Sequence, residues 1–487
     1  MRSTINTFRL RVLSTMLLSL FVHFTNAQIT FEKKWGGDGY QDGQYISSTS
    51  DGGFIIAGIS TSDSTPYTNI VLMRVDSLGD SLWTKNYGGP GSNDFPSAVV
   101  QTRDGGFLVS STTYSLSSQA PNYSDWWILR TDANGDTLWT KMIRKPNNDR
   151  MWDISENDDG SFLACGWLSV NGYAKATMMK FSETGDSLWS VQIGSSANSY
   201  AQFCQQNYDG NYLLAGAFLS GTFQGIVMEY DTAGTLLNSH IYDKQGTVEN
   251  INSVHHLAQG GYIISAKSGT INGYDVWVLR TNDNWDTLWT QTYNDPFYLY
   301  DTEAKFAFDA TSDNGFIFGG AKFTGASSEA VLYRMDSTGA SLWTSYYGGN
   351  TNGEDKTSSV LSLADGGFIL SGQTEMTANN DGDIYLVRTN ANGLVTSLSK
   401  SDAIESSTQF LLFPNPSKNK VHWESKYISI SCLRLLSMSG SILHTYEQAG
   451  TSGELNFAGL VPGIYIVEFV SEISVHRKRL IIEFYLN

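Results

Sequence analysis

The stretch Ser50-Asp51-Gly52-Gly53-Phe54, followed by the apolar run Ile55 to Ile59, recurs in related form along this chain of 487 residues. The seven tetrads are Asp51-Gly-Gly-Phe54, Asp104-Gly-Gly-Phe107, Asp159-Gly-Ser-Phe162, Asp209-Gly-Asn-Tyr212, Gln259-Gly-Gly-Tyr262, Asp313-Asn-Gly-Phe316 and Asp365-Gly-Gly-Phe368. Their aromatic residues lie 50 to 55 residues apart. A fixed period of this length is typical of repeat folds, so the tetrads predict the architecture of most of the chain.

Each repeat is predicted to contain four short antiparallel strands. The tetrad turn joins the first strand to the second, and a turn such as Asp76-Ser-Leu-Gly-Asp80 joins the third to the fourth. Asp caps the backbone of such turns and Gly adopts positive φ, which marks both turns as hairpin connections. In the first repeat the strands are expected at Gln44 to Thr49, Phe54 to Ile59, Ile70 to Val75 and Leu82 to Tyr87.

Two residue types recur in register with the second turn. The tryptophans are Trp83, Trp139, Trp189, Trp289 and Trp343, with Asn238 and Ser397 in the fourth and seventh repeats. The arginines, two residues before the turn, are Arg74, Arg130, Arg280, Arg334 and Arg388. The fifth turn, Asn282 to Trp289, lacks the glycine. A large ring that recurs at one position is expected to pack between neighbouring sheets, and we interpret the arginines as structural too.

Seven four-stranded units of about 53 residues resemble the blades of a β-propeller. We therefore expect an all-β chain with a seven-bladed propeller over residues 28–400. The fourth-strand phrase occurs an eighth time, because Phe31 to Gly37 matches Trp83 to Gly89. The N-terminal strand is thus predicted to complete the last blade, which removes a free sheet edge. The repeats are similar to those of surface proteins of Bacteroidota, a resemblance that brings no catalytic residue with it.

The composition and the first residues predict an exported protein. Arg2, Arg9 and Arg11, then the apolar run Val12 to Phe24, then Thr25-Asn26-Ala27, are typical of a secretory signal peptide over residues 1–27. No later apolar stretch approaches the ~18 residues of a membrane span. The net charge of -17 argues against binding to nucleic acid. Three cysteines exclude a disulfide-dense scaffold; Cys165 and Cys204 lie in neighbouring repeats, and we expect buried free thiols rather than a pair.

A different segment follows the repeats. After a polar linker at residues 401–409, residues 410–487 alternate apolar positions with glycine turns, which predicts a small β-sandwich. The opening Pro414-Asn415-Pro416, a strand pair around Ser439-Gly440, the strand around Gly463 and Tyr465, and a basic strand from Arg477 follow one another. This order resembles the type A C-terminal sorting domain of type IX secretion substrates. The resemblance implies the type IX machinery and its sortase as partners, and a secreted or surface-attached product.

Function is expected on the face that we call the variable face, formed by the longer loops between second and third strands and between repeats. The opposite face, here the turn face, carries the tetrad and Asp-x-x-Gly turns and is expected to be structural. Acidic residues recur ten positions before the tetrad: Asp94, Asp149, Glu249 and Asp355, with Asp42 and Asp301 slightly out of register and Ser199 in place of an acid. They predict either a ring of carboxylates that binds calcium or a set of caps on backbone amides at each junction.

Aromatic residues outside the repeat pattern are the other candidates. Trp126, Trp152, Tyr298 and Tyr300 lie near variable loops, and such rings stack on sugars while carboxylates beside them accept sugar hydroxyls. The histidines of the repeats, His240, His255 and His256, have no metal-ligand spacing, and no nucleophile or phosphate-loop motif occurs. We therefore expect a binding protein for glycans or other extracellular polymers. The alternatives are a glycoside hydrolase or polysaccharide lyase that uses loop carboxylates, and a non-catalytic adhesion or display scaffold.

Overall fold

The computed structural model describes residues 28–482 apart from 37–38, 63–64, 118–121, 195–196, 245–246, 271–272, 294–306, 324–326, 349–352, 377–381, 396–409, 414, 416, 418, 426–428, 438–441, 448–449, 458–459, 462 and 472–474. The regular secondary structure of this part of the chain consists of β-strands. Within it, no helix has the length and apolar character needed to cross a membrane. Two compact units are formed, one spanning Ile29–Lys400 and the other containing Ser401–Asn487.

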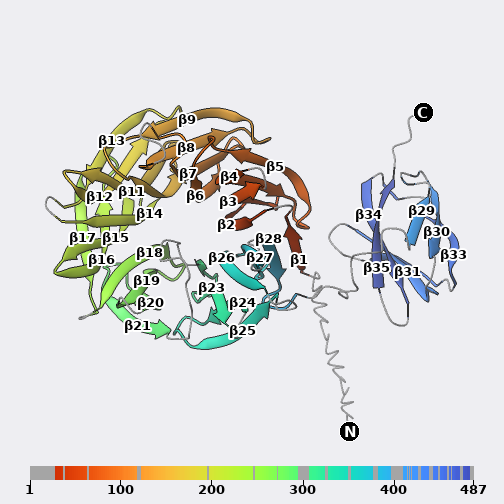
Figure 1. Ribbon diagram of the computed structural model, residues 1–487. Helices are drawn as coiled ribbons and strands as arrows, with labels where there is room; N and C mark the ends of the chain where they lie inside the picture. The colour runs from red at the N-terminus through yellow and green to blue at the C-terminus, as the bar shows by residue number, and fades with distance from the viewer. Residues whose placement is uncertain are drawn as a thin grey trace, which may run out of the picture. The chain divides into compact units, whose positions relative to one another are not determined.

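The first unit is a series of four-stranded antiparallel sheets arranged as a ring (Figure 1). Five sheets stand apart and correspond to repeats one to five. They are β2 (Gln41–Ser48), β3 (Phe54–Ser62), β4 (Thr65–Val75), β5 (Ser81–Tyr87); β6 (Asp94–Gln101), β7 (Phe107–Thr113), β8 (Asp125–Thr131), β9 (Thr137–Ile143); β10 (Arg150–Glu156), β11 (Phe162–Val170), β12 (Tyr173–Phe181), β13 (Ser187–Gln192); β14 (Ser199–Gln206), β15 (Tyr212–Ser220), β16 (Thr222–Tyr230), β17 (Leu236–Tyr242); β18 (Val248–His256), β19 (Tyr262–Thr270), β20 (Gly273–Thr281), β21 (Thr287–Tyr293).

The remaining strands of the ring form one eight-stranded sheet that contains two sets of four. The first set is β22 (Ala307–Ala310), β23 (Phe316–Phe323), β24 (Ser328–Met335) and β25 (Ser341–Tyr347). The second is β26 (Glu354–Ser362), β27 (Phe368–Met376), β28 (Asp383–Thr389) and the N-terminal β1 (Phe31–Trp35). Within the residues that the structure describes, a single parallel residue pair, Ser328 with Glu354, joins the two sets.

The N-terminal strand occupies the fourth position of the last set, as the sequence predicts. Strand β1 pairs antiparallel with β28, and Phe31 lies opposite Arg388 in the same register that places Trp83 opposite Arg74. Strand pairing therefore joins the beginning of the Ile29–Lys400 unit to its last repeat, and the last set of strands has no vacant fourth position.

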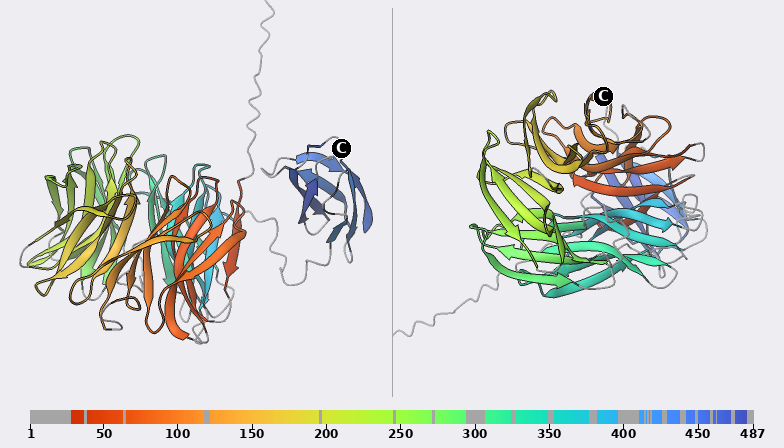
Figure 2. Two further views of the ribbon diagram at one scale, coloured as in Figure 1. Left: turned by 90° about the horizontal axis from the view of Figure 1, so that it is seen from above. Right: turned by 60° about the vertical axis from the view of Figure 1, so that its left-hand side comes forward.

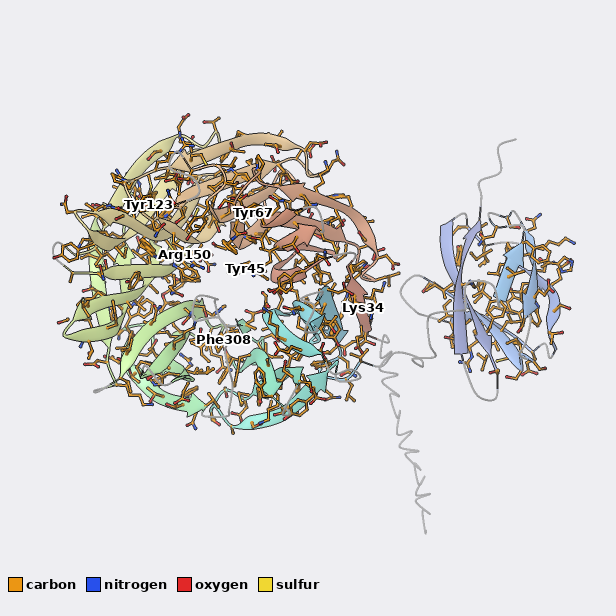
Figure 3. The ribbon with its side chains drawn as sticks, viewed as in Figure 1. Lys34, Tyr45, Tyr67, Tyr123, Arg150 and Phe308 are labelled. Carbon is orange, nitrogen blue, oxygen red and sulfur yellow. The ribbon has the colours of Figure 1, made fainter. Side chains whose placement is uncertain are left out.

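First strands of neighbouring repeats contact one another on the inner side of the ring. Tyr45, Arg150 and Phe308, which belong to β2, β10 and β22, lie there (Figure 3). Seen from the side, the strands run between the two faces of the ring, and the connecting segments lie at those faces (Figure 2).

The recurring arginine explains the second glycine of the tetrad. The Arg74 guanidinium forms an ion pair with Asp51 and donates to the Phe54 carbonyl oxygen at 3.0 Å. A Cβ atom on Gly53 would lie 2.5 Å from Arg74 Nη1 and 2.4 Å from the Val75 carbonyl oxygen, so only glycine fits. Where the chain replaces this glycine, by Ser161 and Asn211, it also replaces the arginine, by Lys180 and Glu229.

The recurring tryptophan packs between neighbouring repeats, which confirms the expectation of a structural role. Each ring contacts the tetrad aromatic of the next repeat, as Trp83 contacts Phe107 with 5.7 Å between ring centroids. The same ring covers the glycine of the next Asp-x-x-Gly turn: a Cβ on Gly135 would lie 2.9 Å from Trp83. At the ring closure Phe31 covers Gly79 in the same way. Equivalent centroid pairs are Trp139–Phe162, Trp189–Tyr212, Trp289–Phe316 and Trp343–Phe368.

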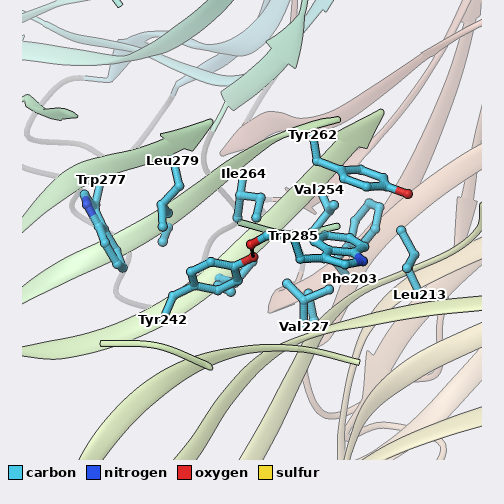
Figure 4. Packing of buried hydrophobic residues seen from close by; sticks show 13 residues of the cluster. Phe203, Leu213, Val227, Tyr242, Val254, Tyr262, Ile264, Trp277, Leu279 and Trp285 are labelled. Carbon is cyan, nitrogen blue, oxygen red and sulfur yellow. Dashed lines mark hydrogen bonds between the residues drawn. The ribbon is translucent and has the colours of Figure 1, made fainter. Parts of the chain in front are cut away.

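Between the fourth and fifth repeats, the tryptophan comes from the turn of the fifth repeat and not from the fourth strand of the fourth repeat. Asn238 stands in the tryptophan position of the fourth repeat, and Trp285 replaces the glycine of the fifth turn with a φ of 66°. The Trp285 ring stacks on Tyr262 with 3.9 Å between centroids and packs among Phe203, Val227 and Tyr242 (Figure 4). The indole thus fills, from the other side of the interface, the space that the missing tryptophan leaves.

The second unit has two sheets that share one apolar core. Trp423, Leu455, Val467 and Phe469 are among its buried residues. The sheets consist of β29 (Phe410–Phe413), β30 (Lys420–Ser425) and β33 (Ser452–Asn456), and of β32 (Ile442–Tyr446), β31 (Cys432–Leu436), β34 (Gly463–Val470) and β35 (Val475–Ile482).

All three cysteines are free, and Cys165 and Cys204 are buried in one apolar cluster. The expectation of buried free thiols at these two positions is confirmed. Apolar packing and hydrogen bonds therefore hold the described fold together without a disulfide.

The exchange at Trp285 predicts a compensating pair of substitutions. Trp285→Gly should lower the free energy of unfolding by about 3 to 5 kcal/mol, because it leaves a void beside Tyr262. Asn238→Trp added to that variant should restore most of the loss, since it rebuilds the contact of the other repeats, whereas Asn238→Trp alone should overpack the site. Chemical denaturation of the three variants measures this. A double variant no more stable than Trp285→Gly would contradict the exchange.

Candidate functional site

A cavity of about 600 Å³ opens among the ends of four first strands. Strands β10, β14, β18 and β22 contribute Glu156, Gln206, His255 and Asp309 to its lining, and the tetrad turns that follow contribute Asp158 and Tyr208. The cavity therefore lies on the turn face, where we expected only structural residues. The full lining is Ser155, Glu156, Asp158, Gln205, Gln206, Asn207, Tyr208, Leu213, Val254, His255, His256, Asp309 and Ala310.

Side chains at the strand ends hold neighbouring repeats together beside the cavity. Gln206 Oε1 accepts the backbone N–H of Asp158 at 2.6 Å, and Glu156 Oε2 accepts that of Arg103 at 3.0 Å. Asp309 Oδ2 accepts the backbone N–H of Ser362 at 2.7 Å. Each contact uses one oxygen of its side chain, so the carboxylates of Glu156 and Asp309 retain a second oxygen for other partners.

His255 and Asp309 are the most perturbed titratable groups of the cavity. Their side chains are 25% and 22% exposed, and His255 Nδ1 lies 3.6 Å from Asp309 Oδ1. Burial lowers the pKa of His255 to about 4. Burial raises the pKa of Asp309 to about 6, although backbone hydrogen bonds from Ser362 and Ala310 oppose the shift. At neutral pH the imidazole is therefore neutral and able to accept a proton.

The side chains of His255, Ser253 and Ser265 form a chain of contacts that reaches the cavity wall at His255. His255 Nε2 lies 3.1 Å from Ser253 Oγ, which in turn lies 2.7 Å from Ser265 Oγ. Ser253 and His255 stand two residues apart on β18, so their side chains point to the same side of the strand. These contacts fix the orientation of the imidazole ring in the cavity wall.

An aromatic surface lies at the rim. The Tyr208 side chain is 63% exposed, and its ring lies 4.0 Å from the His256 ring, measured between centroids. His256 Nε2 is 3.6 Å from Asp283 Oδ1. The cavity thus combines an exposed ring with amide, hydroxyl and carboxylate groups, which are the groups that bind hydroxylated ligands.

Asp94, Asp149 and Asp355 of the variable face are buried and accept hydrogen bonds from backbone N–H or side-chain hydroxyl groups. Asp94 accepts from Gly89 N and Ser115 Oγ, at 3.2 and 2.6 Å, and from Thr113. Asp149 accepts the backbone N–H groups of Lys145 and Ser169, both at 2.7 Å. Asp355 accepts Thr374 Oγ1 at 2.6 Å. This is the geometry of the capping alternative.

Within the described residues, no group of three or more His, Cys, Asp or Glu side chains is arranged to hold a metal ion. Asp94, Asp149 and Asp355 have exposed fractions of 0%, 0% and 3%, so each carboxylate is enclosed in its own junction.

The aromatic candidates are also placed differently from expectation. Trp126 is fully buried, and its indole N–H donates to the Trp167 carbonyl oxygen at 3.0 Å. Trp152 is 5% exposed, with the Arg150 guanidinium 4.4 Å from its ring centroid. Neither ring offers an open face to a ligand. Tyr298, Tyr300 and Asp301 lie outside the described residues.

In the second unit, part of the sorting motif is described. Tyr465 is buried and its hydroxyl donates to the Val461 carbonyl oxygen at 2.7 Å, while Gly463 begins β34. Asn415 is exposed. Pro414 and Pro416 lie outside the described residues.

Sequence reasoning missed the cavity residues, although a signal for them was present. Four positions before the tetrad, the repeats carry Ser47, Val100, Ser155, Gln205, His255, Asp309 and Leu361. Only serine occurs there more than once, in contrast to the tryptophan and arginine positions. The variation marks positions that the fold does not constrain, and two of them hold ionisable groups.

Comparisons with known proteins concern the two units separately. Residues 411–483 match the family described as the secretion system C-terminal sorting domain. A search of curated protein sequences found no match. Solved structures with similarity to this chain include a protein of unknown function from Dyadobacter fermentans (10% identity, TM-score 0.46, 74% of this chain and 99% of that chain). They also include an ulvan lyase from a polysaccharide lyase family (10%, 0.47, 74% and 97%) and the β-propeller domain of the Trilobed protease from Pyrococcus furiosus (9%, 0.40, 75% and 100%).

The sorting-domain match confirms the prediction for the C-terminal segment. Its order of motifs is that of a type IX sorting domain, which implies contact with the secretion machinery. The protein is accordingly exported, and is secreted or attached to the outer-membrane surface. The Ile29–Lys400 unit is all-β, with its four-stranded sheets in a propeller-like arrangement.

The geometry at Asp94 predicts a structural rather than a metal-dependent role. Asp94→Ala should lower the free energy of unfolding by about 3 kcal/mol, because Thr113, Ser115 and Gly89 lose a charged acceptor in a buried site. Calcium should leave the thermal midpoint of the unchanged protein where it was. A calcium-dependent rise in that midpoint that disappears in Asp94→Ala would contradict the capping role.

Proposed function

We propose that this protein is an exported seven-bladed β-propeller that binds glycans or other extracellular polymers in the turn-face cavity. A signal peptide at residues 1–27 and a sandwich-like sorting domain at 410–487, after a linker at 401–409, would direct it out of the cell. Seven sets of four strands support the blade number, because among the described residues Ser328–Glu354 is the single pair that joins the last two sets.

The observation that carries the proposal is the cavity of about 600 Å³ with Tyr208 exposed at its rim. Ligand sites are concave and place a few polar groups around apolar or aromatic surface. A sugar ring presents C–H groups to an aromatic face and hydroxyl groups to amides and carboxylates. Gln205, Gln206 and Glu156 supply such groups in the cavity wall.

Binding to purified protein tests this proposal. A panel of soluble polysaccharides and oligosaccharides, measured by calorimetry, should include at least one ligand. Tyr208→Ala should weaken its binding about tenfold, since loss of one stacking ring costs on the order of 1 to 2 kcal/mol. The matched control is Tyr173→Ala, an exposed tyrosine outside the cavity lining that should leave binding unchanged. Equal effects of the two variants, or no ligand in the panel, would contradict the cavity as the site.

A second candidate function is polysaccharide cleavage, favoured by the Ser253–His255–Asp309 chain of contacts. His255 would be the group that takes a proton from a substrate, although a pKa lowered to about 4 makes its imidazole a weak base at neutral pH, which is why cleavage is the second candidate. We therefore propose the cavity as the site of the catalytic alternative, instead of the loop carboxylates where we expected it.

Product release from the same panel separates the two functions. If the protein cleaves a polymer, new reducing or unsaturated ends should appear and should be lost in His255→Gln. His240→Gln is the matched control, because His240 lies outside the cavity lining. Binding without product release over long incubation would rule out cleavage of that ligand.

A further inference from the structure

The charge of the cavity wall decides which saccharides it favours. We propose that the cavity selects saccharides that carry primary ammonium groups, such as glucosamine oligomers, over neutral and acidic ones. The inference rests on the proposed binding function and names the ligand class for that same site.

The described lining residues include three acids and no lysine or arginine. The acids are Glu156, Asp158 and Asp309. Arg103 is close by, but its Nη2 lies 3.1 Å from Asp158 Oδ1 and its Nη1 donates to the Asp158 carbonyl oxygen. The guanidinium therefore pairs with Asp158 at the rim, and within the described residues neither Glu156 nor Asp309 forms an ion pair with a lysine or arginine.

In the described part of the chain, no lysine or arginine pairs with the Asp309 carboxylate. Ser362 N–H binds one oxygen, and the other oxygen faces the His255 imidazole at 3.6 Å. That imidazole is neutral at neutral pH, because its pKa is lowered by burial. A ligand ammonium group beside Asp309 would supply the missing positive charge and form a charge-assisted hydrogen bond.

Glu156, at the end of β10, is the second lining acid that forms no ion pair with a lysine or arginine in the described residues. One of its oxygens accepts Arg103 N–H, and burial raises the pKa of the carboxyl group against the opposing effect of Arg103. Burial causes the raised pKa, because the charges of Arg103 and Arg130 both favour the ionised form.

Negative charges of the protein would repel acidic saccharides both at short range and at long range. Uronate or sulfate groups would face Glu156 and Asp309 at short range, and at longer range a chain with a net charge of -17. An amino sugar keeps the ring face that stacks on Tyr208 and adds the positive charge, whereas a lysine-rich peptide would have only the charge.

Calorimetry with defined oligomers tests the charge preference. The probes are a glucosamine pentamer, the N-acetylated pentamer of the same length, an oligogalacturonate and a pentalysine peptide. We expect the glucosamine pentamer to bind at least about tenfold more tightly than the acetylated one, with an advantage that shrinks as salt is added. Asp309→Asn and Glu156→Gln each retain a carbonyl oxygen for the backbone contact, and each should remove about tenfold of the glucosamine affinity. Asp243→Asn, an exposed acid outside the cavity lining, is the charge-matched control.

The outcomes separate this inference from the function on which it rests. Equal binding of the two pentamers, with Tyr208→Ala weakening both, would overturn the ammonium preference and leave the binding site in place. Tighter binding of pentalysine than of the glucosamine pentamer would overturn the saccharide class. No binding of any probe, together with no ligand in the wider panel, would overturn both proposals.

Discussion

The contact between one repeat's fourth-strand aromatic ring and the next repeat's tetrad and turn is the interaction on which the ring depends. It joins a tryptophan such as Trp83 to Phe107 and to Gly135 at once. An aromatic pair of this kind adds about 0.5 to 1.5 kcal/mol beyond its buried area, and it recurs between neighbouring repeats. The chain keeps the contact even where it changes the residues. Phe31 supplies the ring at the closure, and Trp285 supplies it from the turn.

This contact constrains the fourth strand of one repeat and the second strand and turn of the next. It leaves the ends of the first strands, on the inner side of the ring, free to vary. The tetrad aspartate and its arginine fix the hairpin, the tryptophan fixes the neighbour, and neither reaches the position of His255 or Asp309. A ring built in this way offers an equivalent inner position in each repeat, at which side chains change without loss of the frame. The cavity lies where four consecutive repeats place polar residues at those positions.

The strand pattern, the structural tryptophans and the N-terminal closing strand could be predicted because each repeats, and repetition averages out local ambiguity. The burial of Asp94 and Asp149 could not, because an acid that caps a junction and an acid that binds a ligand have the same spacing in sequence. The cavity could not be predicted either. His255 and Asp309 are 54 positions apart in the sequence, and only the curvature of the ring brings their side chains to 3.6 Å. Trp126 shows the converse: a residue outside the repeat pattern is not thereby exposed.

The cavity residues also carry an energetic cost that the fold itself does not require. The folded-state pKa of Asp309 is about 6, above its ordinary value of 3.8, so its contribution to stability is fully present below pH 3.8 and is lost as the pH rises through 6. At neutral pH the shift corresponds to about 3 kcal/mol of destabilisation. Leu361 occupies the equivalent position of the next repeat, so the ring accepts an apolar residue there. The carboxyl group gains a backbone hydrogen bond from Ser362, yet it is kept at this cost beside a neutral imidazole and an open cavity, and costs of this kind concentrate where proteins bind or react.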